Sequence, residues 1–293
     1  MGAVQCCSVK QPRREAQDEM KQDVSKSNSG ILRSNKSTSA LINQKIESAK
    51  KLRQLNLNDL SVKNLDARFD QLNNISVISI VNCQLEGFKD TGIDVLKNSI
   101  DTLKKVNFTK NAISKIPLEL FKCPDLQIVN FSSNKLKEIP DQINQLRNLR
   151  ELDFSHNLIK NIPASITVCS QIKVITLNNN HINEFNLAFL KLPNLEYLYM
   201  SQNEIAILPD DQLWAVSSLK VLDLESNSLY EVPPVVFKQS KLHNLNLKDN
   251  HILRSKLMKM DGIDEYQNRR KIKMDIVVQN NLDVNYDLCG LDK

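Results

Sequence analysis

The first eight residues, MGAVQCCS, carry the side chains best suited to covalent chemistry. Removal of the initiator methionine would expose Gly2, the acceptor for N-myristoylation, although the motif prefers Ser or Thr where Cys6 stands. One myristoyl chain gives only marginal membrane affinity, and Cys6 and Cys7 are suited to palmitoylation as a second anchor. We therefore expect dual acylation and a peripheral association with the cytosolic face of a membrane. The alternative is a cytosolic protein in which glycine follows methionine without modification.

Side chains that could support catalysis or metal binding do not form a recognisable site. None of the four histidines, at 156, 181, 243 and 251, pairs with a cysteine or carboxylate at metal-ligand spacing. Six scattered glycines cannot build a phosphate-binding loop. Neighbouring carboxylates such as Glu151 and Asp153 are typical of a solvated surface. The sequence thus predicts a protein without enzymatic activity, with no cofactor, no metal and no small-molecule substrate.

An internal repeat of about 23 residues organises most of the chain. Counting each copy from 1 to 9, positions 1, 4 and 6 are leucine-type, as in Leu126, Val129 and Phe131. Position 9 is asparagine at residues 111, 134, 157, 180, 203, 227 and 250, and Cys83 occupies it in an earlier copy. Most copies continue with an apolar-proline step such as Ile139-Pro140. This is the leucine-rich repeat pattern.

The repeat predicts an α/β fold, a leucine-rich repeat solenoid shaped as a curved horseshoe. Positions 4 and 6 face the core of a concave parallel sheet, and positions 3, 5 and 7 face solvent. Short helical or irregular segments follow on the convex side, where proline fixes φ and donates no hydrogen bond. The asparagine amide both donates and accepts, so a ladder of such amides can bridge one turn to the next.

Composition predicts three parts. Residues 1–50 are rich in serine and lysine and form a flexible acylated arm; residues 51–253 form the repeat domain; residues 254–293 form a capping helix and tail. In the last part, Leu257, Met260, Ile263 and Tyr266 recur every three residues, which suits a helix covering the last turn.

The charge and the cysteines narrow the possible partners and compartment. The net charge of +5 and the absence of a basic-aromatic groove pattern argue against nucleic acid. No apolar run reaches the roughly 20 residues of a membrane span. Six scattered cysteines without a paired framework indicate a reducing compartment, and therefore a cytoplasmic protein.

The repeats and the segment 256–269 carry a family resemblance. The repeats resemble the 23-residue intracellular class of the Ras-pathway scaffolds, with its Ile-Pro step. The segment KLMKMDGIDEYQNR resembles the C-terminal segment in the family of leucine-rich repeat-containing protein 57, which also begins Met-Gly. The resemblance covers about residues 50–273 and implies a small cytosolic or membrane-associated repeat protein with no known chemistry.

The solvent-facing strand positions contain one candidate binding patch. Two tyrosines on one strand lie beside two valines, and four carboxylates flank them: Tyr197, Tyr199, Val174, Val221, Glu151, Asp153, Asp223 and Glu225. Aromatic residues ringed by polar groups are typical of interaction hot spots. A partner protein would then present basic residues near an apolar anchor. The alternative is that strands simply tolerate an exposed tyrosine.

The sequence predicts a membrane-tethered adaptor or scaffold that binds a protein on its concave face. A regulatory subunit of a phosphatase or another signalling enzyme is the alternative, although such proteins typically have repeats of about 22 residues. A structural component of a cortex or cilium would leave no distinguishing mark in the sequence.

Overall fold

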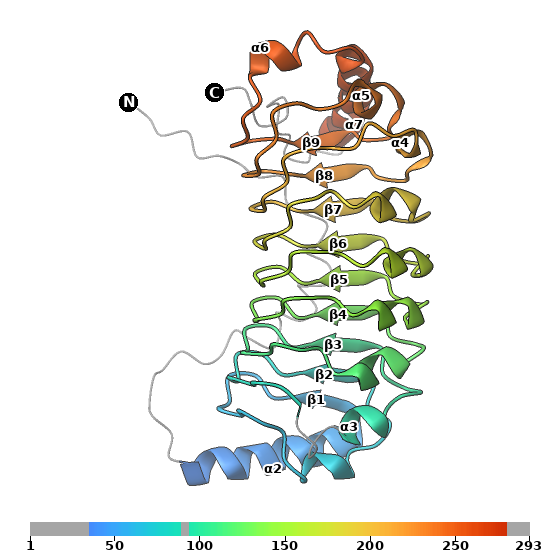
Figure 1. Cartoon of the computed structure of the whole chain (residues 1–293). Coiled ribbons are helices and arrows are strands. Elements are labelled where there is room, and N and C mark those ends of the chain that lie inside the picture. The colour runs from blue at the N-terminus through green and yellow to red at the C-terminus, as the bar shows by residue number, and fades with distance from the viewer. Residues whose placement is uncertain (1–34, 89–93, 280–293) are drawn as a thin grey trace.

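The computed structural model describes residues 35–88 and 94–279, and one parallel sheet runs through them from end to end (Figure 1). Each strand covers positions 3 to 5 of one repeat and pairs with its neighbours in chain order. The nine strands are β1 (Gln54–Asn56), β2 (Val77–Ser79), β3 (Lys105–Asn107), β4 (Ile128–Asn130), β5 (Glu151–Asp153), β6 (Val174–Thr176), β7 (Tyr197–Tyr199), β8 (Val221–Asp223) and β9 (Asn244–Asn246). The predicted leucine-rich repeat solenoid is confirmed.

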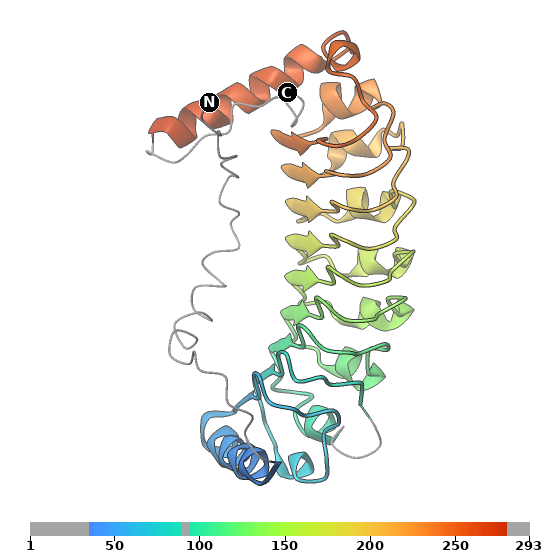
Figure 2. The same cartoon turned by 90° about the vertical axis from the view of Figure 1, so that its left-hand side faces the viewer.

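Short helical turns line the opposite side of the solenoid (Figure 2). They are η1 (Phe69–Gln71), α3 (Asp94–Lys97), η2 (Leu118–Lys122), η3 (Asp141–Gln145), η4 (Ala164–Val168), η5 (Leu187–Lys191), α4 (Leu213–Val216) and α5 (Pro234–Gln239). An extended proline precedes each of η2, η3 and η4. The repeat before η5 lacks this proline, yet forms the same turn because the Asn186 side chain accepts the Ala188 N–H at 2.8 Å.

A continuous apolar core fills the space between the sheet and the helical turns. Aromatic rings at position 6 stack through its middle. Phe108 and Phe131 have ring centroids 5.0 Å apart, and Phe131 and Phe154 meet edge to face at 5.8 Å. All three are fully buried. Because every repeat shares this core with its neighbours, no single turn can bury its apolar residues alone.

The predicted asparagine ladder is confirmed. The Asn134 amide donates to the Phe108 carbonyl of the preceding turn at 2.8 Å and to the Phe131 carbonyl of its own turn at 3.0 Å. Its side-chain oxygen accepts the Ile113 N–H at 3.0 Å. Cys83 takes the same place in an earlier turn, where its thiol donates to the Leu57 carbonyl. Each ladder residue therefore satisfies buried backbone groups of two turns.

A helix covers the N-terminal end of the solenoid, where the sequence predicts a flexible arm up to residue 50. Helix α2 spans Asn35–Leu52, and Ile42, Ile46 and Ala49 are buried on one face. These residues recur every three or four positions, which is the spacing of an amphipathic helix. The serine-rich composition predicts a flexible arm through residue 50, whereas residues 35–50 lie in this helix.

Two helices instead of one close the C-terminal end. The predicted continuous pattern over Leu257–Tyr266 breaks into α6 (Arg254–Leu257) and α7 (Ile263–Gln279). Gly262 joins them with φ of 90°, and a Cβ atom there would lie 2.8 Å from the Lys238 backbone nitrogen. The buried Tyr266 hydroxyl accepts the Leu245 N–H of β9 at 3.0 Å. Helix α7 projects from this end beyond the strand side of the solenoid (Figure 2).

Candidate protein-binding face

The outer surface of the sheet, formed by positions 3, 5 and 7 of the repeats, is here called the concave face. Parallel pairing aligns Val174 with Tyr197 and Tyr197 with Val221. The same register places Ile128 beside Glu151 and Glu151 beside Val174. All five side chains are half-buried. We call Ile128, Glu151, Val174, Tyr197 and Val221 the position-3 row.

The sequence predicts that Tyr199 faces solvent, but the structure shows that it is buried. Tyr199 is 4% exposed, and Thr176, which occupies the same position 5 in the preceding repeat, is 1% exposed. Adjacent strands lie about 4.8 Å apart, so a side chain at position 5 is flanked by the position-5 side chains of both neighbouring strands. Tyr199 pairs in register with Thr176 and Asp223. The half-buried Tyr197 is therefore the aromatic residue of the patch that remains accessible.

Two of the four predicted carboxylates are bonded to the last strand and its following turn. Asp223 accepts the Glu225 N–H at 3.1 Å and the Asn246 amide at 3.0 Å. Burial raises the pKa of Asp223 from its ordinary value. Glu225 pairs with Lys248 at 2.9 Å and accepts a second bond from Asn246 at 3.1 Å. Asn246 and Lys248 thus bind the carboxylates for which the sequence predicts basic residues of a partner.

The other two carboxylates differ from each other. Asp153 accepts the Ser155 hydroxyl at 2.7 Å, the Ser155 N–H at 3.1 Å and the Asn130 amide at 3.3 Å. Glu151 lies in the position-3 row, and its carboxylate makes no hydrogen bond or ion pair with the residues described. The sequence alone could not show that three of the four predicted carboxylates are internally bonded.

A line of position-2 residues, most of them basic, borders the concave face and was not among the residues predicted from the sequence. At position 2, directly before each strand, stand Lys104, Gln127, Arg150, Lys173, Glu196 and Lys220. Strand alternation identifies only positions 3, 5 and 7 as solvent-facing. The position-2 side chains are nevertheless exposed or half-buried, whereas positions 1 and 4 on either side are buried. Reading this column of the repeat would have found it.

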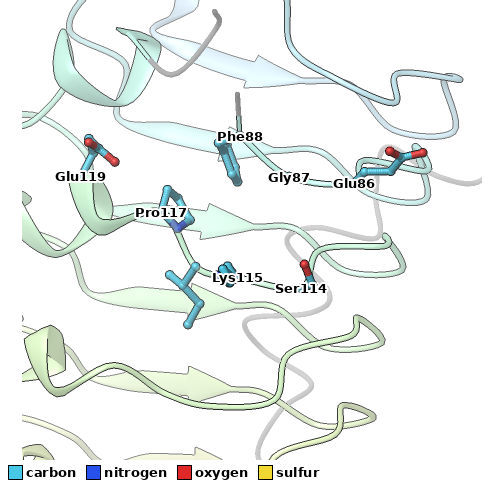
Figure 3. Close-up of a pocket in the computed structure, with 8 residues that line it drawn as sticks. Glu86, Gly87, Phe88, Ser114, Lys115, Pro117 and Glu119 are labelled. Atoms are coloured by element: carbon cyan, nitrogen blue, oxygen red, sulfur yellow. The ribbon is translucent and has the colours of Figure 1, made fainter. Parts of the chain in front are cut away.

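A cavity of about 340 Å³ lies among the turns that follow β2 and β3 (Figure 3). Phe88 and Pro117 lie in its middle, and the carboxylates of Glu86 and Glu119 lie at opposite ends. Its charged groups therefore do not converge on one point. Among residues 35–88 and 94–279, no group of three His, Cys, Asp or Glu side chains could hold a metal ion. We assign no chemistry to this cavity.

The cysteines of the repeat domain are core residues. Cys83, Cys123 and Cys169 are free and buried, and burial raises the pKa of each thiol to about 11. They are therefore protonated and unreactive near neutral pH. The predicted lipidation sites Gly2, Cys6 and Cys7 lie outside the described residues. No helix within the described part of the chain is both long and apolar enough to span a membrane.

Comparisons with known proteins agree with this architecture. A leucine rich repeat family model matches residues 101–159, 147–205 and 170–229. Toll-like receptor 4 of Equus caballus is 31% identical over 100 residues, which cover 29% of this chain and 12% of the receptor. The chain therefore matches only a small part of that relative.

Two solved structures share the fold. A leucine-rich repeat protein of Leptospira interrogans is 23% identical with a TM-score of 0.63, covering 72% of this chain and 52% of that one. A plant peptide hormone receptor in complex with RGF2 is 24% identical with a TM-score of 0.52, covering 65% and 38%.

The structure and these matches show a leucine-rich repeat fold, and the three stretches matched by the family model lie within residues 101–229. Solenoids of this class present extended surfaces for recognition, and they typically act as interaction modules without enzymatic activity. The finer resemblance to the family of leucine-rich repeat-containing protein 57 stays a prediction.

Proposed function

We propose that this chain is an adaptor that binds a protein partner on its concave face and is tethered to a membrane by acylation of Gly2, Cys6 and Cys7. The observation that carries the binding proposal is the position-3 row. Three apolar side chains, Val174, Tyr197 and Val221, stand in register on the open face of a sheet. An aromatic residue with apolar neighbours and a polar surround has the anatomy of an interaction hot spot.

The rest of the molecule supports this assignment. Helices α2 and α7 cover the two ends of the sheet, and the core lies behind the strands, so the concave face is the extended surface that the described elements leave open. A plant peptide hormone receptor of the same fold was solved in complex with RGF2, so the fold is compatible with binding a peptide hormone. The partner here is proposed as a protein, with no nucleic acid and no small-molecule substrate.

Replacing Tyr197 by alanine is expected to weaken partner binding at least tenfold, because the substitution removes the aromatic anchor of the row. Tagged full-length chain would be purified from its own cells, a co-purifying partner identified, and its affinity measured by titration with parent and variant. A tenfold loss corresponds to about 1.4 kcal/mol, and truncation of a hot-spot residue typically costs about 2 kcal/mol or more.

Tyr230→Ala is the matched control, because Tyr230 is 63% exposed, stacks on His251 and is not at position 3, 5 or 7 of its repeat. It should leave the affinity unchanged. If Tyr197→Ala has no effect while the variant stays folded, the concave-face assignment is wrong. Phosphatase activity in the purified complex would instead favour the regulatory-subunit hypothesis.

Replacing Gly2 by alanine is expected to move the protein from the membrane fraction to the soluble fraction, because alanine is not an acceptor for N-myristoylation. Fractionation of cells expressing each form, with metabolic labelling by a myristate analogue, measures both steps. A Cys6→Ser/Cys7→Ser form should keep the label but bind membranes weakly, because one acyl chain gives marginal affinity. Unchanged fractionation of Gly2→Ala would exclude the proposed tether.

A further inference from the structure

A continuous line of position-2 residues borders the position-3 row. Backbone hydrogen bonds join these residues from turn to turn. The Gln127 N–H donates to the Lys104 carbonyl at 2.8 Å, and the Arg150 N–H donates to the Gln127 carbonyl at 2.8 Å. The Lys173 N–H then donates to the Arg150 carbonyl at 2.9 Å. Further bonds continue the line through Glu196 and Lys220. We call Lys104, Arg150, Lys173 and Lys220, together with Lys105 at position 3, the basic row.

Most charges of the basic row are not neutralised within the described chain. Lys104, Lys105, Arg150 and Lys173 are exposed, and their side chains make no ion pair or hydrogen bond with described residues. Lys220 pairs with Glu196 at 2.8 Å. The carboxylates Asp153, Asp223 and Glu225 are held by hydrogen bonds or an ion pair, as described above. The cations beside the apolar residues are therefore more available to a partner than the anions.

The positive character continues at the C-terminal end of the row. His243 is the position-2 residue of the last turn. Burial, together with the nearby charges of Lys273 in α7 and Lys220, lowers the pKa of His243 to about 4. Lys273 and Lys220 therefore lie close enough to His243 for their charges to affect its pKa. No titration of His243 is needed for binding, because the ring is already neutral at physiological pH.

We propose that the partner binds as an extended acidic protein segment, with apolar side chains on Ile128, Val174, Tyr197 and Val221 and carboxylates on the basic row. This inference rests on the proposed use of the concave face and reverses the charge expected from sequence. The row from Lys104 to Lys220 crosses six turns, or about 24 Å at roughly 4.8 Å for each strand. An extended segment of about seven residues spans that length.

Glu151 makes the proposal testable. Its unbonded carboxylate lies within the position-3 row, next in sequence to Arg150. An acidic segment is repelled by Glu151, whereas a basic segment is attracted to it. Neutralising this residue therefore changes the affinity of the two kinds of partner in opposite directions.

The experiment uses fluorescein-labelled eight-residue peptides in which phenylalanine or leucine alternates with glutamate, and matched peptides with lysine in place of glutamate. Binding to the full-length protein is measured by fluorescence anisotropy in low salt. The glutamate peptide is expected to bind more tightly. Its affinity should fall at least tenfold in the Arg150→Glu/Lys173→Glu form and rise about twofold in Glu151→Gln.

A double variant of two other exposed lysines, Lys137→Glu/Lys160→Glu, makes the same change in net charge outside the row. It should keep the parent affinity within about twofold. An equal loss in this control would show that only net charge matters and would overturn the proposal. Tighter binding of the lysine peptide, weakened by Glu151→Gln, would also overturn it.

Two further outcomes separate this inference from the proposed function. If neither peptide binds, yet Tyr197→Ala still abolishes binding of the cellular partner, the concave face is the site and the acidic segment is wrong. If the glutamate peptide binds equally well to Tyr197→Ala, the concave-face assignment itself fails. Vesicles of phosphatidylcholine with phosphatidylserine complete the test. Loss of vesicle binding in Arg150→Glu/Lys173→Glu, with no effect on peptide binding, would assign the basic row to a membrane instead.

Discussion

Replacing Phe131 by alanine is expected to lower the free energy of unfolding by about 4 kcal/mol, the usual range for a buried phenylalanine being about 3–5 kcal/mol. Phe131 is fully buried and contacts Phe108 on one side and Phe154 on the other. Truncation therefore opens a cavity in the middle of the solenoid and removes two aromatic contacts at once. Equilibrium urea unfolding followed by circular dichroism measures the loss.

Phe131→Leu is the matched control, because other turns carry leucine at the same position 6, as at Leu177 and Leu224. Leucine fills most of the space, so a loss of about 1 kcal/mol is expected. Both variants lose the aromatic contacts, so the difference between their free energies of unfolding measures the effect of the cavity alone. Equal losses would show that the ring contacts, not the filled volume, stabilise the centre of the core.

The strands and their register follow from the repeat alone. Positions 1, 4 and 6 must share one core, and each copy is a structural equivalent of the next, so parallel pairing in chain order is the arrangement that stacks them. The neighbours of Tyr197 could be named for the same reason, because Val174 and Val221 occupy the same position in adjacent copies. The ladder role of the asparagines likewise follows from their chemistry and spacing.

The ends of the solenoid could not be predicted in the same way. Helix α2 is not a copy of any repeat, and its stripe of Ile42, Ile46 and Ala49 is short within a polar segment. At the other end, the three-residue spacing from Leu257 to Tyr266 predicts one helix. The glycine turn at Gly262 divides it, because the chain passes close to Lys238 there. Both features depend on contacts with the rest of the fold.

The electrostatic character of the candidate site was also hidden at the sequence level. Counting carboxylates on the concave face predicts an anionic surface, but a count does not show which of them are bonded. Asn246 and Lys248 come from the neighbouring turn and bond Asp223 and Glu225. The burial of Tyr199 is a similar case, since strand alternation gives the direction of a side chain and not the room around it.

Replacing Asn157 by alanine is expected to lower the free energy of unfolding by about 3 kcal/mol, because several buried backbone groups lose their partner. The Asn157 amide donates to the carbonyls of Phe131 at 2.9 Å and Phe154 at 3.1 Å. Its oxygen accepts the Leu136 N–H at 2.9 Å. Urea unfolding measures the stability, and native-state hydrogen exchange at the Leu136 amide should accelerate more than at the equivalent Ile113 amide, whose acceptor Asn134 is intact.

Asn157→Cys tests whether the ladder or the side-chain volume matters. Cys83 shows that a thiol in this position can donate to the carbonyl of the preceding turn. The cysteine variant should therefore lose about half as much stability as the alanine variant, since the thiol restores one donor and is a poor acceptor for the Leu136 N–H. Protection of that amide should remain low in both. A cysteine variant with parental exchange at Leu136 would show that the side-chain acceptor of Asn157 is dispensable, and the ladder would then stabilise the turns through its donors alone.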